Sequence, residues 1–344
     1  MRKCKFGTHR VIEPAGVLPQ PAWKVDNNPE IADNEILVDV IRLNIDSASF
    51  RQIIEEVGRD EEKVAEKVLK IVSDRGKMHN PVTGSGGMLI GRIAKIGSAL
   101  SDRDLKEGDK IATLVSLSLT PLKIEKINRV ILDQDQLEVT AKAIIFESGI
   151  YAKIPEDMTE TLALSILDVA GAPAQAERLA KKGDTVLIIG AGGKSGLLCT
   201  AAAKKKLGSD VRIIGLVNSE KAFETAKRLG MADDLIRANA KDAVGVYNEV
   251  SRLTDGKMAD LVINCVNVPD TEMSSVLACR DRGKVYFFSM ATSFTKAALG
   301  AEGVGYDIEM IIGNGYCKDH AEISLETVRS IPVLKSIFEE RFSK

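Results

Sequence analysis

The sequence predicts an α/β protein in which a β-rich N-terminal half precedes a doubly wound parallel sheet. Two observations support this. Residues 35–45 (EILVDVIRLNI) alternate in hydrophobicity and are rich in β-branched side chains, which is typical of a strand. After Pro155, short apolar runs alternate with helical segments, as in βαβ units whose strands are buried on both faces. The 344 residues therefore predict two domains, 1–155 and 156–344.

The N-terminal half is expected to be mostly β, with one helical insertion. Over residues 53–73, apolar side chains recur at helical spacing among charged ones, which indicates an amphipathic helix or helix pair. This insertion is a candidate cap over a substrate site or a candidate interface. A glycine-rich turn is expected over 76–91. Further strands are expected at 89–96, 110–118, 122–132 and 143–154.

The C-terminal half begins with a helical region over 159–181. Apolar runs such as TVLII and DLVIN are short, as strands in the middle of a parallel sheet should be. We expect strands at 185–189, 211–217, 259–265, 283–289 and 307–312, and helices at 195–206, 219–229, 270–280 and 320–341.

Composition excludes several classes of protein. The net charge is −2 with 28% charged residues, so neither sign of charge dominates, which argues against a nucleic-acid partner or a polybasic membrane surface. No run reaches the ~18 apolar residues of a membrane span, and the N-terminus has no apolar signal-peptide core. The five cysteines form no CxxC pair, so neither a disulfide framework nor a zinc knuckle is indicated. A soluble cytoplasmic protein is expected.

A glycine loop follows the first strand of the C-terminal half. Its sequence is Gly190-Ala191-Gly192-Gly193-Lys194-Ser195-Gly196, and a helix is expected to open at about Ser195. Strand, glycine loop and helix in this order form the Rossmann dinucleotide-binding fingerprint. The glycines permit the tight turn and the close approach of backbone to a pyrophosphate, which lies at the helix N-terminus. The loop therefore predicts a bound NAD or NADP, although a glycine turn without a ligand is the alternative.

The end of the next strand bears on the choice between the two dinucleotides. NAD enzymes usually carry an Asp or Glu there for the ribose hydroxyls. This chain has Val217, Asn218 and Ser219, with Lys221 close by. The missing carboxylate removes repulsion of a 2′-phosphate, which slightly favours NADP, whereas Lys221 as a solvated helix residue is equally consistent. Two further strand ends are expected to line the nicotinamide half, at Cys265, Val266 and Asn267 and at Ser289 and Met290.

These features together resemble the medium-chain dehydrogenase/reductase superfamily. EILVDVIRLNI and GMLIGRIAKIGSALSDRDLKEGDKIATL look like strands of its GroES-like domain, and the glycine loop looks like its Rossmann domain. The resemblance implies an oxidoreductase, and a homo-oligomer, a dimer, is expected. More narrowly, NPVTGSGGMLIG and the stretch from GDTVLIIGAGGKSG onward resemble a branch that oxidatively deaminates a small diamino acid.

The zinc ligands of many superfamily members are missing from this chain. Where those members carry a ligand cysteine, this sequence reads Leu43-Asn44-Ile45-Asp46-Ser47, and where they carry Gly-His-Glu it reads Gly86-Gly87-Met88. A catalytic zinc needs three protein ligands, and the three histidines are scattered along the chain. No metal is therefore expected.

Oxidation of an amine by hydride transfer needs a group that attracts the ammonium and removes a proton, and a carboxylate suits both tasks. Asp46 lies in the stretch that faces the nicotinamide in the superfamily, with Asn44 and Ser47 beside it. Asp168 stands in apolar company, where an ionised carboxylate needs a partner. A capping role for Asp46 and an internal hydrogen bond for Asp168 are the alternatives. Candidates to bind the substrate carboxylate are Arg51, Lys77 and His79.

Three functions remain open from the sequence. The resemblance favours an NAD(P)-dependent dehydrogenase that acts on the CH–NH2 group of a diamino acid. A zinc-independent, NADPH-dependent quinone or enone reductase is the first alternative, and it would need no carboxylate for an amine. A dinucleotide-binding sensor or structural protein without turnover is the second.

Overall fold

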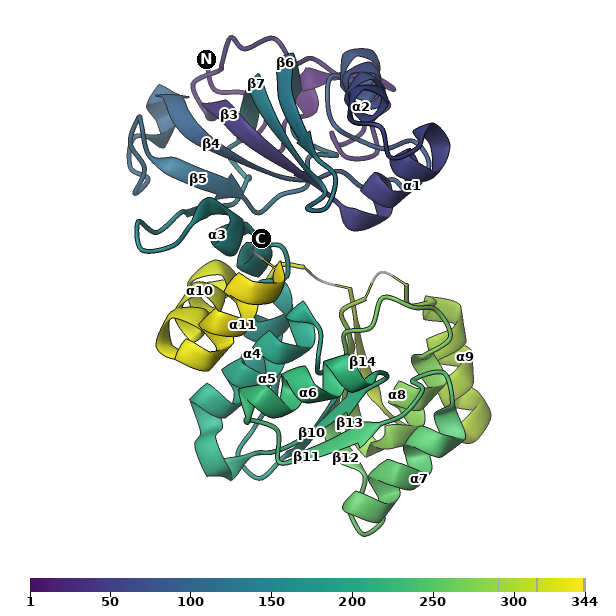
Figure 1. The fold of residues 1–344 in the computed structure, drawn as a ribbon. Coiled ribbons are helices and arrows are strands. Elements are labelled where there is room, and N and C mark those ends of the chain that lie inside the picture. Colours follow the sequence, from purple (N-terminus) through teal and green to yellow (C-terminus); the bar gives the residue numbers. More distant parts are fainter. Residues whose placement is uncertain (290, 314, 343–344) are drawn as a thin grey trace. The chain divides into compact units, whose positions relative to one another are not determined.

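The computed structural model describes residues 1–289, 291–313 and 315–342. The chain forms two compact units, Met1–Glu160 and Thr161–Lys344 (Figure 1). The sequence places this boundary after residue 155. Three short 3-10 helices also occur, at Thr8–Arg10, Ser98–Leu100 and Gly208–Asp210.

The N-terminal unit is built on a six-stranded sheet with the order β6-β7-β3-β4-β5-β8, in which every pair of neighbours is antiparallel. A separate two-stranded sheet joins β1 and β2. The strands are β1 (Val11–Glu13), β2 (Lys24–Val25), β3 (Glu35–Ile45), β4 (Gly87–Ile96), β5 (Lys110–Thr113), β6 (Leu122–Ile131), β7 (Gln136–Phe146) and β8 (Tyr151–Lys153).

Two of the expected strands are wrong in extent. The strand expected over 110–118 ends at Thr113, because the hydroxyl of Ser116 accepts hydrogen bonds from the backbone and side chain of Ser118 and the chain turns there. The strand expected over 143–154 is two strands, since the N–H of Gly149 donates to the carbonyl of Phe146 in a tight turn.

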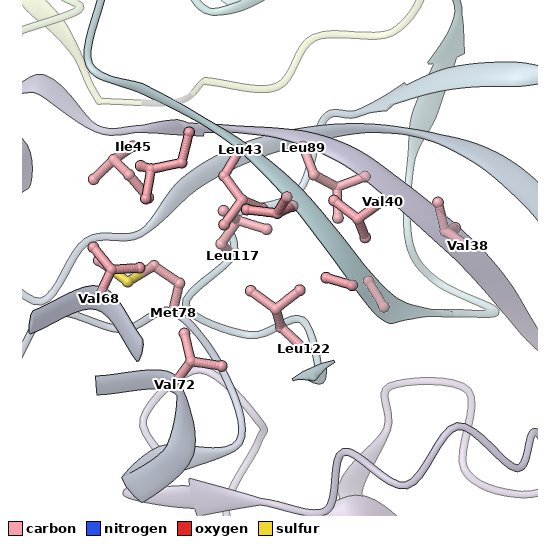
Figure 2. Packing of buried hydrophobic residues seen from close by; sticks show 14 of the residues in the cluster. Val38, Val40, Leu43, Ile45, Val68, Val72, Met78, Leu89, Leu117 and Leu122 are labelled. Carbon is pink, nitrogen blue, oxygen red and sulfur yellow. The ribbon is translucent and has the colours of Figure 1, made fainter. Parts of the chain in front are cut away.

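The helical insertion is a pair of helices, α1 (Ser47–Val57) and α2 (Glu61–Arg75), and it begins earlier than the expected residue 53. The side chains of Asp46 and Asp60 cap the two N-termini. Apolar residues of α2 pack into the core of this unit: Figure 2 shows Val68 and Val72 facing Met78 and the inner side chains of β3, such as Ile45. The insertion is therefore part of the hydrophobic core of the unit.

The C-terminal unit contains a parallel six-stranded sheet with the order β11-β10-β9-β12-β13-β14 (Figure 1). This is the Rossmann strand order, in which the direction of winding reverses between the first strand and the fourth, here β9 and β12. The predicted fold class is confirmed. The strands are β9 (Thr185–Ile189), β10 (Arg212–Val217), β11 (Asp234–Arg237), β12 (Ala259–Asn264), β13 (Cys279–Phe287) and β14 (Glu309–Ile312).

Alternate residues of the central strand β9 enter two different hydrophobic clusters. Leu187 and Ile189 belong to one cluster, and Val186 and Ile188 belong to the other. Both faces of the sheet are thus covered, which is why TVLII carries no polar side chain after its first residue.

Two of the helices expected in this region are interrupted, and three further elements were not expected. The helix expected over 159–181 is interrupted at residues 168–170, and the helix expected over 320–341 breaks before Pro332, whose ring cannot continue a helix. Strand β11 and helices α7 and α9 have no counterpart in the expectation. The helices are α3 (Glu160–Leu167), α4 (Gly171–Leu179), α5 (Lys194–Leu207), α6 (Glu220–Leu229), α7 (Ala243–Leu253), α8 (Glu272–Ala278), α9 (Phe294–Val304), α10 (His320–Ser330) and α11 (Pro332–Phe342). In the described part of the chain, no helix is long and apolar enough to cross a membrane.

Candidate active site

A cavity of about 450 Å³ opens at the carboxyl ends of β9, β10 and β12. This is the position at which parallel α/β sheets bind their ligands, beside the reversal of strand order. The cavity is lined by Gly190, Gly192, Gly193, Leu216, Val217, Asn218, Ala222, Asn239, Ala240, Cys265, Val266, Asn267, Val268 and Arg341.

Three glycines of the loop, Gly190, Gly192 and Gly196, have no room for a side chain. Gly190 has a φ of +90°, a conformation that residues with a Cβ rarely adopt. A Cβ on Gly192 would lie 2.5 Å from the carbonyl oxygen of Ala222, and a Cβ on Gly196 would meet the carbonyl oxygen of Gly190. Helix α5 begins directly after Gly193, and no side chain caps it. Its first N–H groups and the positive end of its dipole are therefore available to an anion such as a pyrophosphate.

Half of the predicted cofactor residues line this cavity: Gly190, Gly192, Gly193, Asn218, Cys265, Val266 and Asn267. The other described residues of this set lie in the same loops or in the helices that follow them, and they are not among the lining residues. Ser219 accepts a hydrogen bond from the N–H of Ala222 and caps α6, while Lys221 is exposed. Ser289 lies within 3.5 Å of the amide oxygen of Asn267. Lys194, Ser195 and Gly196 open α5, and Met290 lies outside the described residues.

Arg341, from the last helix α11, also lines the cavity and was not predicted from the sequence. Its Nη1 donates to the hydroxyl of Thr225 at 2.7 Å and to the carbonyl of Gly192 at 3.2 Å. The side chain is half-buried, and this burial lowers the pKa of the guanidinium. Within the described residues no carboxylate pairs with it, so its positive charge is available to a ligand. Asn239 and Ala240 were also missed, because they follow the unpredicted strand β11.

Asp46 is held by one of its two carboxylate oxygens. Oδ1 accepts hydrogen bonds from the N–H groups of Ala48 and Ser49, at 3.0 and 3.4 Å, and from the hydroxyl of Ser85 at 3.1 Å. The hydroxyl of Ser49 lies 2.6 Å from that of Ser85 and 2.5 Å from that of Thr83. Across the described ranges, no hydrogen bond reaches Oδ2. The carboxylate is therefore both a helix cap and a fixed acceptor with one unused oxygen.

The two polar residues beside Asp46 have structural partners. Asn44 accepts a hydrogen bond from the side chain of Gln136 at 3.2 Å, and the hydroxyl of Ser47 donates to Asp135 at 2.8 Å. Both contacts join the end of β3 to the start of β7, so these side chains fix the backbone on which Asp46 lies.

Asp168 lies in the break between α3 and α4 and forms an ion pair with Lys194. The distance from Nζ to Oδ2 is 2.7 Å, and the two side chains are 32% and 34% exposed. The structure thus brings a residue predicted to be catalytic into contact with a residue of the glycine loop. Sequence spacing gives no signal of this contact, because 26 residues separate the two.

The candidates for binding the substrate carboxylate differ in their surroundings. Lys77 is fully buried, and its Nζ donates to the carbonyls of Pro19 and Gln20 at 2.6 and 2.9 Å. Burial, together with nearby Arg75, lowers the pKa of Lys77 to about 7. Burial, together with the nearby charges of Lys77 and Arg75, lowers the pKa of His79 to about 4. Lys77 therefore anchors the N-terminal segment, whereas Arg51 is exposed.

A catalytic zinc does not fit the residues present. Over residues 1–289, 291–313 and 315–342, no group of three or more His, Cys, Asp and Glu side chains is arranged to hold a metal ion. Beside Asp46 stand the hydroxyls of Ser49, Thr83 and Ser85, which are not the thiolate and imidazole ligands that zinc prefers.

Comparison with known proteins extends these observations. A model of zinc-binding dehydrogenases matches residues 196–311. A mycobacterial protein solved with NADPH covers 92% of this chain and 84% of its own, with a TM-score of 0.56 and 18% identity. A mycobacterial quinone oxidoreductase covers 94% of this chain and 92% of its own, with a TM-score of 0.57 and 16% identity. The strand order, the glycine loop and these likenesses define an oxidoreductase of the medium-chain dehydrogenase/reductase class.

The N-terminal unit and the full-length relatives narrow the class. A model of the L-erythro-3,5-diaminohexanoate dehydrogenase N-terminal domain matches residues 9–155. L-erythro-3,5-diaminohexanoate dehydrogenase of Acetoanaerobium sticklandii is 59% identical over 99% of this chain and 100% of its own length. The enzyme of that name from Fusobacterium nucleatum is 57% identical over 98% of both chains. The chain belongs to the L-erythro-3,5-diaminohexanoate dehydrogenase family, which confirms the resemblance seen in the sequence.

The packing of the glycine loop leads to a first prediction. Gly196→Ala should weaken dinucleotide binding by about tenfold. The new Cβ would collide with the carbonyl oxygen of Gly190 and displace the loop, at a cost of ~1–3 kcal/mol. Titration of the folded variant with NAD and NADP measures the effect. Gly303→Ala is the control, since a Cβ there meets nothing within 4 Å. An unchanged affinity in Gly196→Ala would contradict this account of the loop.

Buried Lys77 leads to a second prediction. The folded protein holds Lys77 with a pKa of about 7, below its usual 10.5, so the unfolded chain binds more protons between these values. Stability should therefore rise with pH from about 7 to about 10, by at most about 1.4 kcal/mol per pH unit from this group. Urea unfolding of Lys77→Met at several pH values should show a shallower rise. Exposed Lys63→Met should keep the parent slope, and equal slopes in all three proteins would refute the assignment.

Proposed function

We propose that the protein oxidatively deaminates L-erythro-3,5-diaminohexanoate to 5-amino-3-oxohexanoate and ammonia, with NAD or NADP as the electron acceptor. The full-length identity with two enzymes of that name carries this proposal. The dinucleotide cavity supports it, because the reaction needs an electron acceptor. The carboxylate of Asp46 also supports it, because the reaction needs a group that binds an ammonium and only Oδ1 of Asp46 accepts hydrogen bonds from the described residues.

We also propose that the reaction belongs to lysine fermentation, that the protein is cytoplasmic and that it forms a homodimer. The pathway and the dimer follow from the resemblance, and the cytoplasmic location follows from the composition of the chain.

The residues of the glycine loop and the cavity suit the dinucleotide. The N–H groups at the start of α5 would hold the pyrophosphate, and Asn218, at the end of β10, would meet the adenosine ribose. The nicotinamide, when bound, supplies the acceptor for the hydrogen that leaves C3 of the substrate with its electron pair.

Asp46 is the proposed general base. The substrate ammonium should have a pKa near that of lysine, ~10, and it must lose a proton before its carbon can be oxidised. Oδ2 of Asp46 is placed to accept this proton, while three hydrogen bonds to Oδ1 hold the carboxylate in one orientation. Once Oδ2 has released this proton to solvent, the same oxygen is able to take a second proton, from the water that attacks the iminium carbon.

The activity itself is the decisive test of the proposed function. Purified protein mixed with L-erythro-3,5-diaminohexanoate and NAD or NADP should form reduced nicotinamide and ammonia in equal amounts. Oxidation of NADPH by quinones or enones, without reaction of the diamine, would instead support the reductase alternative. Cofactor binding with no turnover of any of these compounds would support a sensor.

Asp46→Asn should lower kcat by about 10²- to 10⁴-fold, since asparagine still caps α1 but cannot accept a proton. The matched control is Asp60→Asn, because Asp60 caps α2 through the same kind of backbone contacts. The control should keep the parent kcat. Equal activity of both variants would remove Asp46 from the proposed mechanism.

Arg341 is a proposed phosphate-binding residue of the dinucleotide site. Arg341→Gln should weaken dinucleotide binding about tenfold or more, because a hydrogen bond to a charged group is lost. If the bound group is a 2′-phosphate, only NADP affinity falls; if it is the pyrophosphate, both affinities fall equally. Exposed Arg252→Gln, on α7, should leave both affinities unchanged. Unchanged affinities in Arg341→Gln would exclude this role.

A further inference from the structure

Lys194 occupies an unfavourable place for a cation. It is the first residue of α5, where the unpaired N–H groups and the helix dipole carry partial positive charge. The first turn of α5 contains no acidic residue that would offset this charge, and Gly193 before it has no side chain. A lysine at this position needs an anion from elsewhere in the chain or from a ligand. In the structure that anion is Asp168, at 2.7 Å.

The Lys194–Asp168 pair is suited to exchange of partners. Both side chains are about one-third exposed, so water competes with the pair and its net contribution to stability is small. Neither side chain forms another hydrogen bond or ion pair in the part of the chain that the structure describes. Lys194 also follows Gly193, which lines the dinucleotide cavity. A phosphate bound at the start of α5 would therefore lie within reach of the Lys194 ammonium.

We propose that Lys194 exchanges Asp168 for a phosphate of the dinucleotide, and that Asp168, once released, pairs with an ammonium of the substrate. This inference rests on the proposed function. Before binding, the two charges neutralise each other. With the dinucleotide bound, the phosphate takes the cation and the carboxylate is left without a partner. A carboxylate without a partner attracts a cation, and the diamine supplies one as its ammonium group.

The exchange couples the two binding sites. An ammonium that meets Asp168 while it is paired with Lys194 must break the pair, whereas the dinucleotide complex offers the carboxylate directly. The dinucleotide therefore binds first in the productive order, and each ligand tightens the binding of the other by the same factor. The Lys194–Asp168 pair stabilises the enzyme without ligands relative to the complex with dinucleotide alone and the complex with diamine alone. The diamine therefore binds weakly until the dinucleotide is present.

The first arm of the test measures dinucleotide affinity without any amine, by calorimetric titration at one fixed ionic strength. Asp168→Asn removes the competitor of the phosphate and should tighten binding about three- to fivefold. Lys194→Gln removes the cation and should weaken binding about tenfold. In Lys194→Gln, the further change Asp168→Asn should have no effect, because the competitor acts only through Lys194.

Asp234→Asn is the matched control for the loss of a carboxylate from an ion pair. Asp234 pairs with Arg212 at 2.8 Å, and these two residues start β11 and β10, at the opposite end of the strands from the glycine loop. The dinucleotide affinity of Asp234→Asn should equal that of the parent protein. An unchanged affinity in Asp168→Asn would overturn the exchange, as would the same gain in the presence and absence of Lys194. Asp168→Ser replaces Asp168→Asn if thermal melting shows the latter to be unfolded.

The second arm titrates L-erythro-3,5-diaminohexanoate into the enzyme with and without reduced dinucleotide, a pair of ligands that cannot react. The parent should bind the diamine about three- to fivefold more tightly with the dinucleotide present, and Asp168→Asn should lose this difference. Equal affinities in the parent would overturn the coupling. Failure of the diamine to react with oxidised dinucleotide would overturn the proposed function alone, because the first arm still decides whether Lys194 exchanges its partner.

Discussion

The close packing of the glycine loop against β10 and α6 is the constraint on which the candidate site depends. The N–H groups of Gly190 and Ala191 both donate to the carbonyl of Leu216, at 2.8 and 3.1 Å, which fixes the loop to the neighbouring strand β10. Gly192 in turn lies against Ala222 at the start of α6. With side chains excluded from these contacts, the start of α5 lies at the carboxyl edge of the sheet. The cavity, the contact of Arg341 with Gly192 and the Lys194–Asp168 pair all depend on that placement.

The elements with strong local patterns could be predicted from the sequence, and the others could not. The strand 185–189 was predicted to the residue, because a short apolar run between a turn and a glycine loop has few other interpretations. Strand β11 was missed, since four residues with two charged ends show no period. The break before Pro332 was missed even though the signal was present, because the apolar spacing on both sides was taken as one helix.

The candidate site shows the same division. Loop residues that follow a recognisable strand could be assigned to the cavity, whereas Arg341 reaches it from the far end of the chain through tertiary packing alone. Asp46 was predicted from the sequence as a candidate catalytic carboxylate. The hydrogen bond that it accepts from the hydroxyl of Ser85, 39 residues away, could not be predicted. For Asp168 the sequence left two partners open, a substrate ammonium or a group within the chain, and the structure supplies the internal one, Lys194. Such pairings are a property of the fold, and local sequence does not contain them.

The anchoring of Arg341 has a consequence for how this family can diverge. Its two acceptors are the backbone carbonyl of Gly192 and the hydroxyl of Thr225, so the position of the guanidinium does not depend on residue 218. Residue 218, by contrast, lines the cavity, and within the described residues its side chain forms no hydrogen bond or ion pair. Selection for one dinucleotide over the other can therefore act on position 218 while the charge at 341 stays in place. A change of cofactor in a descendant of this enzyme would need few mutations and no rearrangement of the sheet.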